Sequence, residues 1–475
     1  MNLILQRKSF HTFIAAIFPL LIISVKNYSI VKPYQLFIPA AYILSILSIS
    51  YFISFFILKS KVKAFIFSTF ILISGFYFYT VIQKAVNLLG HQYQRDIFCF
   101  SIWVAICVFI LWFVKVKLSA ENANKLNRFL NNFSVILLAI SIINSIYQIK
   151  SHKVNYHPEQ SAESAQLQFA KQTPASRLNV YYLLLDECTN TQSLKKHFNY
   201  NNLFPEKLRA LNFFVCKAPH SLYTNTLPSM SSTLNMVPIN EETVTEDYFT
   251  HNTVNHIYKK MGYQTEMVTS FFVKNFGKIN SDIIHDPYPD DIFENEFTGT
   301  ILMNTAFWAL YKSLTYKREI DYHAAAVKNS FTLSDSIIQS RPSRPRFMYM
   351  HINSPHTPYC LDSLGNNNYN YFANDKKVNY LNQLIYTENR TVSTVKKILE
   401  RENGNCIILI QSDHAFRGNA LPVNPISADE KLDVVNAFYF PDTSKYTLLS
   451  DTMKIVNNFR TIFNYQFDTG FTMLP

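Results

Sequence analysis

Residues 179–187 read NVYYLLLDE, and this stretch decides the fold. Six apolar or aromatic residues in an unbroken row predict a strand buried on both faces, as in the middle of a parallel sheet. Asp186 and Glu187 follow directly, where the strand ends. In open α/β sheets ligands bind outside the carboxyl ends of the strands, so the same stretch indicates where chemistry is to be expected.

Similar runs recur along the chain after this strand. They lie at 213–216, 263–269, 346–352, 405–412 and 434–440. Helical stretches lie between them, most clearly over 378–400, where apolar residues recur at helical spacing. Alternation of strands and helices predicts a doubly wound α/β domain with a mostly parallel sheet over residues 177–475.

The first 150 residues have a different pattern, with five long apolar segments. These run over about 10–25, 34–58, 64–82, 96–114 and 129–147. Four of them reach the length of about 20 residues that a bilayer core requires. The first is short, but no small-residue cleavage site follows it, so we interpret it as a retained helix and not a signal peptide. We expect a transmembrane domain of five spans over residues 1–150 and a polar linker over 151–176.

The charge distribution excludes a nucleic-acid partner and orients the spans. The net charge is +11, but residues 1–153 hold 15 Lys/Arg against two acidic residues, so the basic excess lies in the apolar third. With the N-terminus inside, nine loop Lys/Arg lie on the cytoplasmic side against six on the other, as the positive-inside rule favours. Five spans then place the rest of the chain outside the cytoplasm. No GxGxxG or GxxxxGK[ST] motif occurs, so a nucleotide site has no support.

The six cysteines leave two interpretations open. None of them forms a CxxC pair. They are either buried free thiols or, in an extracytoplasmic domain, the source of one or two disulfides whose pairing the spacing does not give.

Three predicted strand ends carry carboxylates and imidazoles. They are Asp186-Glu187, His351 with His356, and Asp413-His414. Each alone also fits a helix cap, a turn or a rigid loop residue. Their joint occurrence at one edge of a sheet favours a site for a divalent transition metal, Zn²⁺ or Mn²⁺.

A nucleophile candidate lies in TLPSMSSTLNM, residues 226–236. A hydroxyl followed by Pro228 in the first turn predicts a helix start, where backbone N–H groups favour anions. Thr226 is either a plain N-cap or a nucleophile whose hydroxyl a nearby metal activates. Thr224, two residues earlier, is the alternative nucleophile.

The stretches LLLDE, TLPSMSSTLNM, HINSPHTPY and IILIQSDHAFR together resemble the alkaline phosphatase/sulfatase superfamily. The resemblance covers most of 177–465 and is greatest to the membrane-anchored branch, which includes phosphoethanolamine transferases and lipoteichoic acid synthases. It implies that Thr226 is the nucleophile and a metal ligand, and that His356 and His351 bind the transferred phosphate or the leaving group. The other metal ligands that it implies are Glu187 with Asp186, and Asp413 and His414.

The resemblance also implies a function. It is a metal-dependent transfer of a phosphoethanolamine-like group from a membrane phospholipid to a surface glycan or lipid of the lipopolysaccharide type, through a phospho-threonine. The implied location is the bacterial inner membrane, with several spans and a periplasmic or extracytoplasmic catalytic domain. A membrane-anchored hydrolase of phosphate or sulfate esters is the alternative enzyme, and a non-catalytic scaffold is the alternative outside enzymes.

Departures from the family patterns bear on the substrate. Sulfatases of the formylglycine type need Cys or Ser in a C/S-x-P-x-R setting, and Cys216-Lys-Ala-Pro lacks the arginine, which disfavours sulfate ester hydrolysis. Phosphoethanolamine transferases have Gly after the Asp-His pair and a further His downstream. Here Ala415 follows the pair and residues 415–475 contain no histidine, so donor and acceptor stay open.

Overall fold

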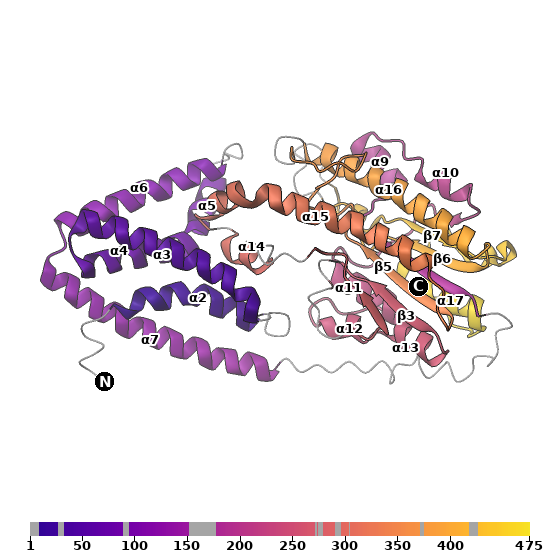
Figure 1. Cartoon of the computed structure of the whole chain (residues 1–475), viewed down its shortest axis with the longest axis horizontal. Helices are drawn as coiled ribbons and strands as arrows, with labels where there is room; N and C mark the ends of the chain where they lie inside the picture. Colours follow the sequence, from indigo (N-terminus) through magenta and orange to yellow (C-terminus); the bar gives the residue numbers. More distant parts are fainter. Residues whose placement is uncertain are drawn as a thin grey trace. The chain divides into compact units, whose positions relative to one another are not determined.

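A computed structural model of the chain divides into two compact units (Figure 1). The apolar unit comprises residues 1–153 and 291–316, and the sheet unit comprises residues 154–290 and 317–475. The structure describes residues 9–26, 33–88, 95–151, 177–270, 273, 279–289, 296–303, 305–370, 375–417 and 426–475. Most of the predicted linker, 152–176, lies outside the described residues.

The apolar unit is built from helices. They are α2 (Phe10–Lys26), η1 (Pro33–Leu36), α3 (Phe37–Leu58), α4 (Lys61–Ile73), η2 (Ser74–Phe78), α5 (Tyr79–Leu88), α6 (Arg95–Val116), α7 (Ala120–Ser151) and α14 (Glu296–Leu302). Within the described residues four helices are long and apolar enough to cross a membrane: Phe37–Leu58, Lys61–Val86, Phe98–Val116 and Ala120–Tyr147. Four predicted spans are therefore supported. The fifth is not confirmed, because α2 has 17 residues and its apolar part, Phe10–Ile22, is shorter than the others.

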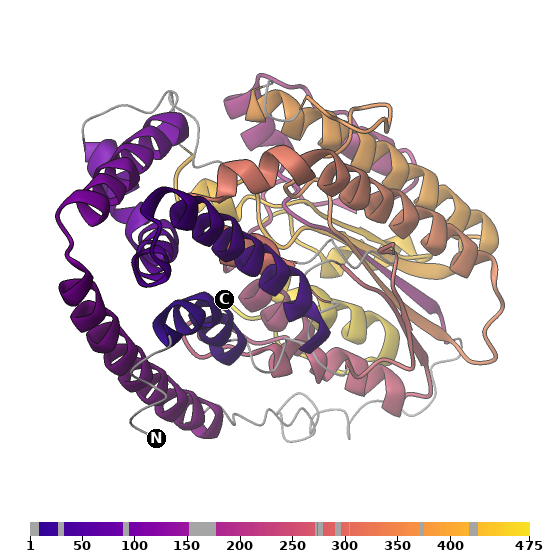
Figure 2. The same cartoon turned by 60° about the vertical axis from the view of Figure 1, so that its left-hand side comes forward.

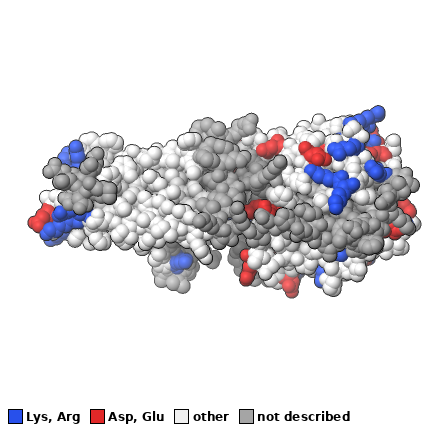
Figure 3. Space-filling model, turned by 90° about the horizontal axis from the view of Figure 1, so that it is seen from below, with Lys and Arg blue, Asp and Glu red and all other residues white. Residues whose placement is uncertain are grey.

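The surface of these helices carries many exposed apolar side chains. Phe52, Phe109 and Ile143 are each more than half exposed. Figure 3 shows a broad uncharged area over the described part of this unit, with charged residues mainly at the left-hand end of the view. Apolar surface on this scale is typical of contact with lipid.

A buried polar cluster ties three of these helices together. His11 of α2 contacts Thr69 Oγ1 of α4 through Nδ1 (2.7 Å) and Asn127 Oδ1 of α7 through Nε2 (3.0 Å). The backbone N–H of His11 also donates to Asn131 Oδ1. Polar contacts of this kind join helices in an apolar environment. The sequence pattern, which showed only apolar segments here, did not predict them.

The sheet unit contains one seven-stranded sheet in the order β2-β7-β6-β1-β5-β3-β4. Its strands are β1 (Asn179–Leu185), β2 (Phe214–Val215), β3 (Gln264–Val268), β4 (Ile283–His285), β5 (Arg346–Ile352), β6 (Cys406–Gln411) and β7 (Asn436–Tyr439). The pairs from β6 through β4 are parallel, and β7 pairs antiparallel with β6 and β2. The mostly parallel α/β sheet is thus confirmed. Every predicted strand forms, and β4 was not predicted.

Helices cover both faces of this sheet (Figure 2). In β1, Tyr181, Leu183 and Leu185 face one core, and Val180, Tyr182 and Leu184 face the other. The unbroken apolar run is thereby explained, because successive side chains enter opposite cores. The helices are α9 (Thr191–Phe198), α10 (Phe204–Arg209), α11 (Thr226–Asn235), α12 (Glu246–Thr250), α13 (Thr253–Lys260), α15 (Trp308–Gln339), α16 (Lys376–Arg401) and α17 (Asn458–Phe467), with 3₁₀ turns at Asp429–Leu432, Thr443–Leu448 and Ile455–Asn457.

All six cysteines are buried, and none of them forms a disulfide. Of the two interpretations that the sequence left open, the structure therefore agrees with the buried thiols.

A buried carboxyl group in α16 makes the stability of the sheet unit depend on pH. Glu388 is 4 % exposed and accepts a hydrogen bond from Asn202 Nδ2. Burial raises the pKa of Glu388 from 4.5 to about 8, despite that bond and nearby Lys207. The folded chain therefore keeps a proton that the unfolded chain releases above about pH 4.5. Between these two values the free energy of unfolding falls as pH rises.

Replacing Glu388 with glutamine is expected to remove this dependence, since the amide does not titrate and its oxygen can still accept from Asn202. The wild type should lose about 1.4 kcal/mol of stability per pH unit between about pH 5 and 8 relative to Glu388→Gln. Thermal midpoints of the full chain in detergent at several pH values measure the slope. Glu400→Gln, at an exposed position of the same helix, is the matched control. Parallel pH profiles for wild type and Glu388→Gln would contradict the prediction.

Candidate active site

The strand register brings the predicted site residues to one edge of the sheet. Leu184 of β1 pairs with His351 of β5 and with Gln411 of β6. Asp186 and Asp413 each follow two residues further along, just past the ends of β1 and β6. The carboxyl ends of three neighbouring strands thus converge, as the sequence predicts.

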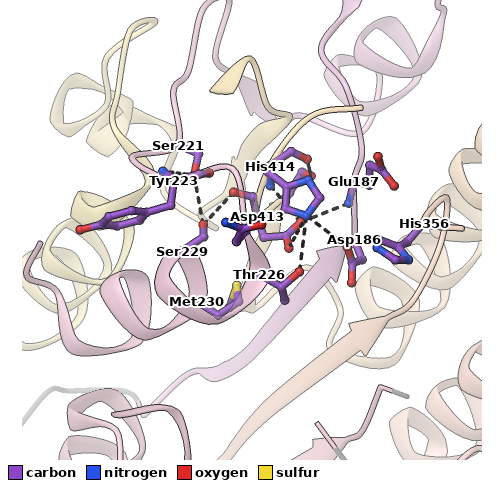
Figure 4. Close-up of polar contacts among 12 residues, drawn as sticks. Asp186, Glu187, Ser221, Tyr223, Thr226, Ser229, Met230, His356, Asp413 and His414 are labelled. Atoms are coloured by element: carbon purple, nitrogen blue, oxygen red, sulfur yellow. Dashed lines mark hydrogen bonds and ion pairs between the residues drawn. The ribbon is translucent and has the colours of Figure 1, made fainter. Parts of the chain in front are cut away.

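Asp186, Asp413 and His414 form a compact group at this edge (Figure 4). One potential ligand atom from each lies within 4.8 Å of the others, and all three side chains are buried. His414 Nε2 lies 3.8 Å from Asp186 Oδ1 and 3.4 Å from Asp413 Oδ2. Two carboxylates and an imidazole at these distances are the donor set of a divalent transition metal.

The hydrogen bonds around this group leave its inner atoms available to a metal. His414 Nδ1 lies 3.0 Å from the carbonyl oxygen of Ala415, which can only accept, so Nδ1 carries the proton and Nε2 has a free lone pair. Asp413 Oδ1 accepts from the backbone N–H groups of Glu187 and His414. Asp186 Oδ1 and Asp413 Oδ2 are buried and accept no hydrogen bond. Buried carboxylate oxygens without donors are costly unless a cation lies between them, so the residues present fit a divalent metal.

Thr226 is the first residue of α11, and its hydroxyl lies beside this group. Its Oγ1 is 3.4 Å from His414 Nε2. Asn225 is the N-cap residue, so the threonine lies one position further into the helix than the sequence predicts. One turn on, Ser229 Oγ donates to the backbone carbonyl of Asp413 at 2.7 Å and ties the helix to the strand end. The alternative, Thr224, precedes the helix.

His351 is fully buried behind Asp186. Its Nε2 faces Asp186 Oδ2 at 3.4 Å, and its Nδ1 contacts the hydroxyl of Tyr349. Burial raises the pKa of Asp186, but His356, His351 and His414 lower it more, so the net pKa is well below the usual value. His351 therefore orients a carboxylate of the group. Its predicted contact with substrate stays a prediction.

The structure does not bring Glu187 into the group of three. Glu187 has a φ of 66°, in the left-handed region, and this backbone turns its side chain away from Asp186. Its Oε1 accepts from the backbone N–H of Arg417 at 2.9 Å. The ligand role that the resemblance gives to Glu187 stays a prediction.

Arg417 is a site residue that sequence reasoning missed. Its Nη2 donates to His356 Nε2 at 2.8 Å, its Nη1 to Asn225 Oδ1 at 3.3 Å, and its Nε lies 3.9 Å from Glu187 Oε1. The side chain is 33 % exposed, so it can also reach an incoming anion. The only sequence signal was its place three residues after His414, in the same strand-end loop.

His356, half-buried, lies between Arg417 and the carboxylates. Its Nδ1 donates to the carbonyl oxygen of Thr357. Burial lowers the pKa of His356, but Asp186 and Glu187 raise it more, so the net pKa lies above 6.5. The imidazole can therefore hold a second proton near neutral pH. Once Nε2 carries that proton it can no longer accept from Arg417, so the guanidinium must then turn away.

A search of protein families gives a match that includes most of these residues. The family described as sulfatase matches residues 193–445, more than half of the chain. The chain belongs to the sulfatase family. Its sulfatase-family region contains Thr226, His351, His356, Asp413 and His414, and begins just after Asp186 and Glu187. No curated protein matches the chain.

Solved structures similar to this sulfatase-family chain share little sequence with it. The C-terminal periplasmic domain of EptC from Escherichia coli, in complex with Zn, is 11 % identical over 63 % of this chain and 84 % of that one, with a TM-score of 0.42. The integral membrane lipooligosaccharide phosphoethanolamine transferase A (EptA) from Neisseria meningitidis is 12 % identical over 79 % and 70 %, with a TM-score of 0.41. The lipoteichoic acid synthase LtaP from Listeria monocytogenes is 10 % identical over 62 % and 73 %, with a TM-score of 0.39.

Proposed function

We propose that the protein is a metal-dependent transferase that moves a phosphoethanolamine-like group from a membrane phospholipid to a surface glycan or glycolipid. The observation that carries the proposal is the Thr226 hydroxyl, 3.4 Å from His414 Nε2, beside two buried carboxylate oxygens that accept no hydrogen bond. A threonine at this position favours phosphoester chemistry, because formylglycine sulfatases start from Cys or Ser.

The proposed metal ligands are Asp186, Asp413, His414 and Thr226. A Zn²⁺ or Mn²⁺ ion held by them would lower the pKa of the Thr226 hydroxyl and neutralise charge on the phosphate. The N-terminal end of α11 offers backbone N–H groups and a positive dipole end to the same phosphate. Arg417 would contact a further phosphate oxygen through its exposed guanidinium.

The proposed reaction has two half-reactions. In the first, Thr226 Oγ1, whose proton has already passed to solvent, bonds to phosphorus, the bond from phosphorus to the diacylglycerol oxygen breaks, and protonated His356 gives its proton to that oxygen. In the second, the acceptor hydroxyl gives its proton to His356 and attacks phosphorus, and the bond from phosphorus to Thr226 Oγ1 breaks, which releases Thr226 again as the alkoxide. The imidazole thus returns to its protonated form at the end of each cycle.

The apolar unit supports a lipid donor. Its helices would hold the sheet unit at a membrane, where phospholipid headgroups are concentrated. We propose a bacterial inner-membrane location with five spans, α2 included, and a periplasmic or extracytoplasmic sheet unit. The asymmetry of Lys and Arg between the loops supports this orientation.

The decisive experiment uses the purified full chain in vesicles that contain headgroup-labelled phosphatidylethanolamine and a glycolipid acceptor, with Zn²⁺ or Mn²⁺. We expect labelled acceptor and an equal amount of diacylglycerol by mass spectrometry. Free headgroup in water without labelled acceptor would favour the hydrolase alternative. A donor that stays intact with either metal, and unchanged surface glycolipids in cells lacking the protein, would favour a scaffold.

Arg417→Gln is expected to lower kcat/KM for the phospholipid donor about 10–100-fold, since a charge-assisted hydrogen bond contributes about 1.5–3 kcal/mol. Arg417→Lys should recover part of the loss, because it keeps the charge but not the planar fork. Initial rates against donor concentration measure both effects. Arg341→Gln, at an exposed position of the sheet unit, is the control. Unchanged donor kinetics for Arg417→Gln would show that Arg417 does not bind the donor.

A further inference from the structure

One stretch within the predicted catalytic domain packs inside the apolar unit. Residues 297–316 read FTGTILMNTAFWALYKSLTY, with Lys312 as the one charged residue. We call residues 296–316 the hairpin: α14, a turn, and the first residues of α15. The chain passes from the sheet unit into the apolar unit before the hairpin and returns to the sheet unit after it.

The hairpin shares its hydrophobic contacts with the long apolar helices. Ile301 and Leu302 lie in one cluster with Ile43 and Leu47 of α3. The rings of Tyr311 and Tyr42 meet edge to face, with centroids 5.5 Å apart. Helix α14 lies against both α2 and α3 (Figure 1).

The tip of the hairpin fits a local irregularity in the span 61–86. Residues Ser74–Phe78 form a π-helical turn, and the carbonyl of Gly75 within it accepts from the backbone N–H of Ala306 at 3.0 Å. The Phe307 ring packs on this turn, and a Cβ atom at Gly75 would lie 2.6 Å from it. Glycine is therefore required here for close approach.

The described backbone N–H groups at the tip donate to acceptors within the protein, as an apolar environment requires. Thr305 N–H donates to the carbonyl of Leu302, and Trp308 N–H donates to the carbonyl of Thr305. The Thr305 hydroxyl donates to Leu302 and accepts from Phe307 N–H.

The contact at Gly75 gives the depth of the tip. Gly75 lies 14 residues after Lys61 and 11 before Val86, so it is about 16–21 Å from either end of that span. The hydrocarbon core of a bilayer is about 30 Å thick, which puts the tip near its middle. On the outside of the hairpin, Leu310 and Leu314 are 61 % and 70 % exposed.

We propose that the hairpin is a re-entrant membrane element, with Leu310 and Leu314 against lipid acyl chains. The sheet unit would then be attached to the bilayer at a second place in the sequence, in addition to its connection to the N-terminal helices. Because both ends of the hairpin join the sheet unit, it enters and leaves the bilayer on the same side. Non-helical backbone at such depth is tolerated where protein buries it, as at Thr305 and Ala306.

The first test measures the surroundings of the hairpin and needs no catalytic activity. The full chain carrying Leu310→Cys or Leu314→Cys is nitroxide-labelled in phosphatidylethanolamine/phosphatidylglycerol vesicles, where the buried native cysteines are shielded. Leu364→Cys, at a position 84 % exposed in the sheet unit, is the control. At positions 310 and 314 we expect the nitroxide to collide with oxygen and not with a water-soluble nickel chelate. At position 364 we expect it to collide mainly with the nickel chelate. Nickel collisions at 310 and 314 equal to those at 364 would overturn the proposal.

The second test concerns the contact between the tip of the hairpin and the π-helical turn. Gly75→Ala should lower the thermal midpoint of the full chain, because the added Cβ meets the Phe307 ring. In a Phe307→Ala background the same change should raise the midpoint, since alanine is a better helix residue than glycine. If Gly75→Ala shifted the thermal midpoint equally in both backgrounds, the proposed packing of the hairpin on the π-helical turn would be wrong.

Discussion

Thr226→Ala is expected to abolish group transfer, with a fall in kcat of more than about a thousandfold, because it removes the nucleophile and leaves only binding. Donor incubated with wild-type protein in the absence of acceptor should leave a phospho-threonine at position 226. The variant should leave none. Mass spectrometry of tryptic peptides measures the adduct, and diacylglycerol release measures the rate.

Two companion variants make this result specific. Thr226→Ser keeps a hydroxyl at the start of α11 and should retain activity within about tenfold. Thr224→Ala should transfer normally, since it is Thr226 Oγ1 that lies beside His414. Thermal stabilisation of Thr226→Ala by Zn²⁺ would show that the variant is folded. Loss of the adduct in Thr224→Ala, with Thr226→Ala still active, would assign the nucleophile to Thr224.

Asp413→Asn is expected to remove metal binding while preserving the local fold. An asparagine oxygen can still accept from the N–H groups of Glu187 and His414, and its amide can donate to His414 Nε2, 3.4 Å from the present Oδ2. Zn²⁺ at about 1,000 times its Kd should stabilise the wild type by about 4 kcal/mol and the variant by little. Transfer should fall at least about a hundredfold.

Without metal, we expect Asp413→Asn to be more stable than the wild type. In EDTA the wild type holds two buried carboxylates whose Asp186 Oδ1 and Asp413 Oδ2 have no donors, and the variant removes one of these charges. Asp413→Asn should therefore melt at a higher temperature than the wild type in EDTA and at a lower temperature in excess Zn²⁺. Thermal melts in both conditions measure the crossing. A variant that is destabilised equally in EDTA and in Zn²⁺ would indicate a structural role only.

Apart from β4, the sequence was sufficient for the strands of the sheet and for the residues that follow them at its carboxyl edge. Strands buried on both faces leave long apolar runs, and Asp186 and Asp413 directly follow two of them. The sequence did not allow us to predict which way each side chain points. Glu187 and Asp186 are neighbours in the chain, but a left-handed φ at Glu187 sends its carboxylate to Arg417. His351 and His356 share one motif, yet only the first is fully buried.

Features that depend on packing between distant segments were also beyond the sequence. The hairpin was missed because Thr298, Thr300 and Thr305 interrupt its apolar run, and the hydrogen bond of the Thr305 hydroxyl to the carbonyl of Leu302 exists only in the folded unit. Thr69 and Asn127, which contact the His11 ring, lie on other helices, so the pattern of α2 alone gives no sign of them.

The polar cluster at the start of α2 has a consequence for biosynthesis. The contact between His11 and Asn127 joins residues 116 positions apart. When α2 leaves the ribosome, the helix that carries Asn127 has not yet been made, so His11 must meet water or lipid headgroups in the meantime. Helix α2 therefore completes its packing only after α7 has been synthesised.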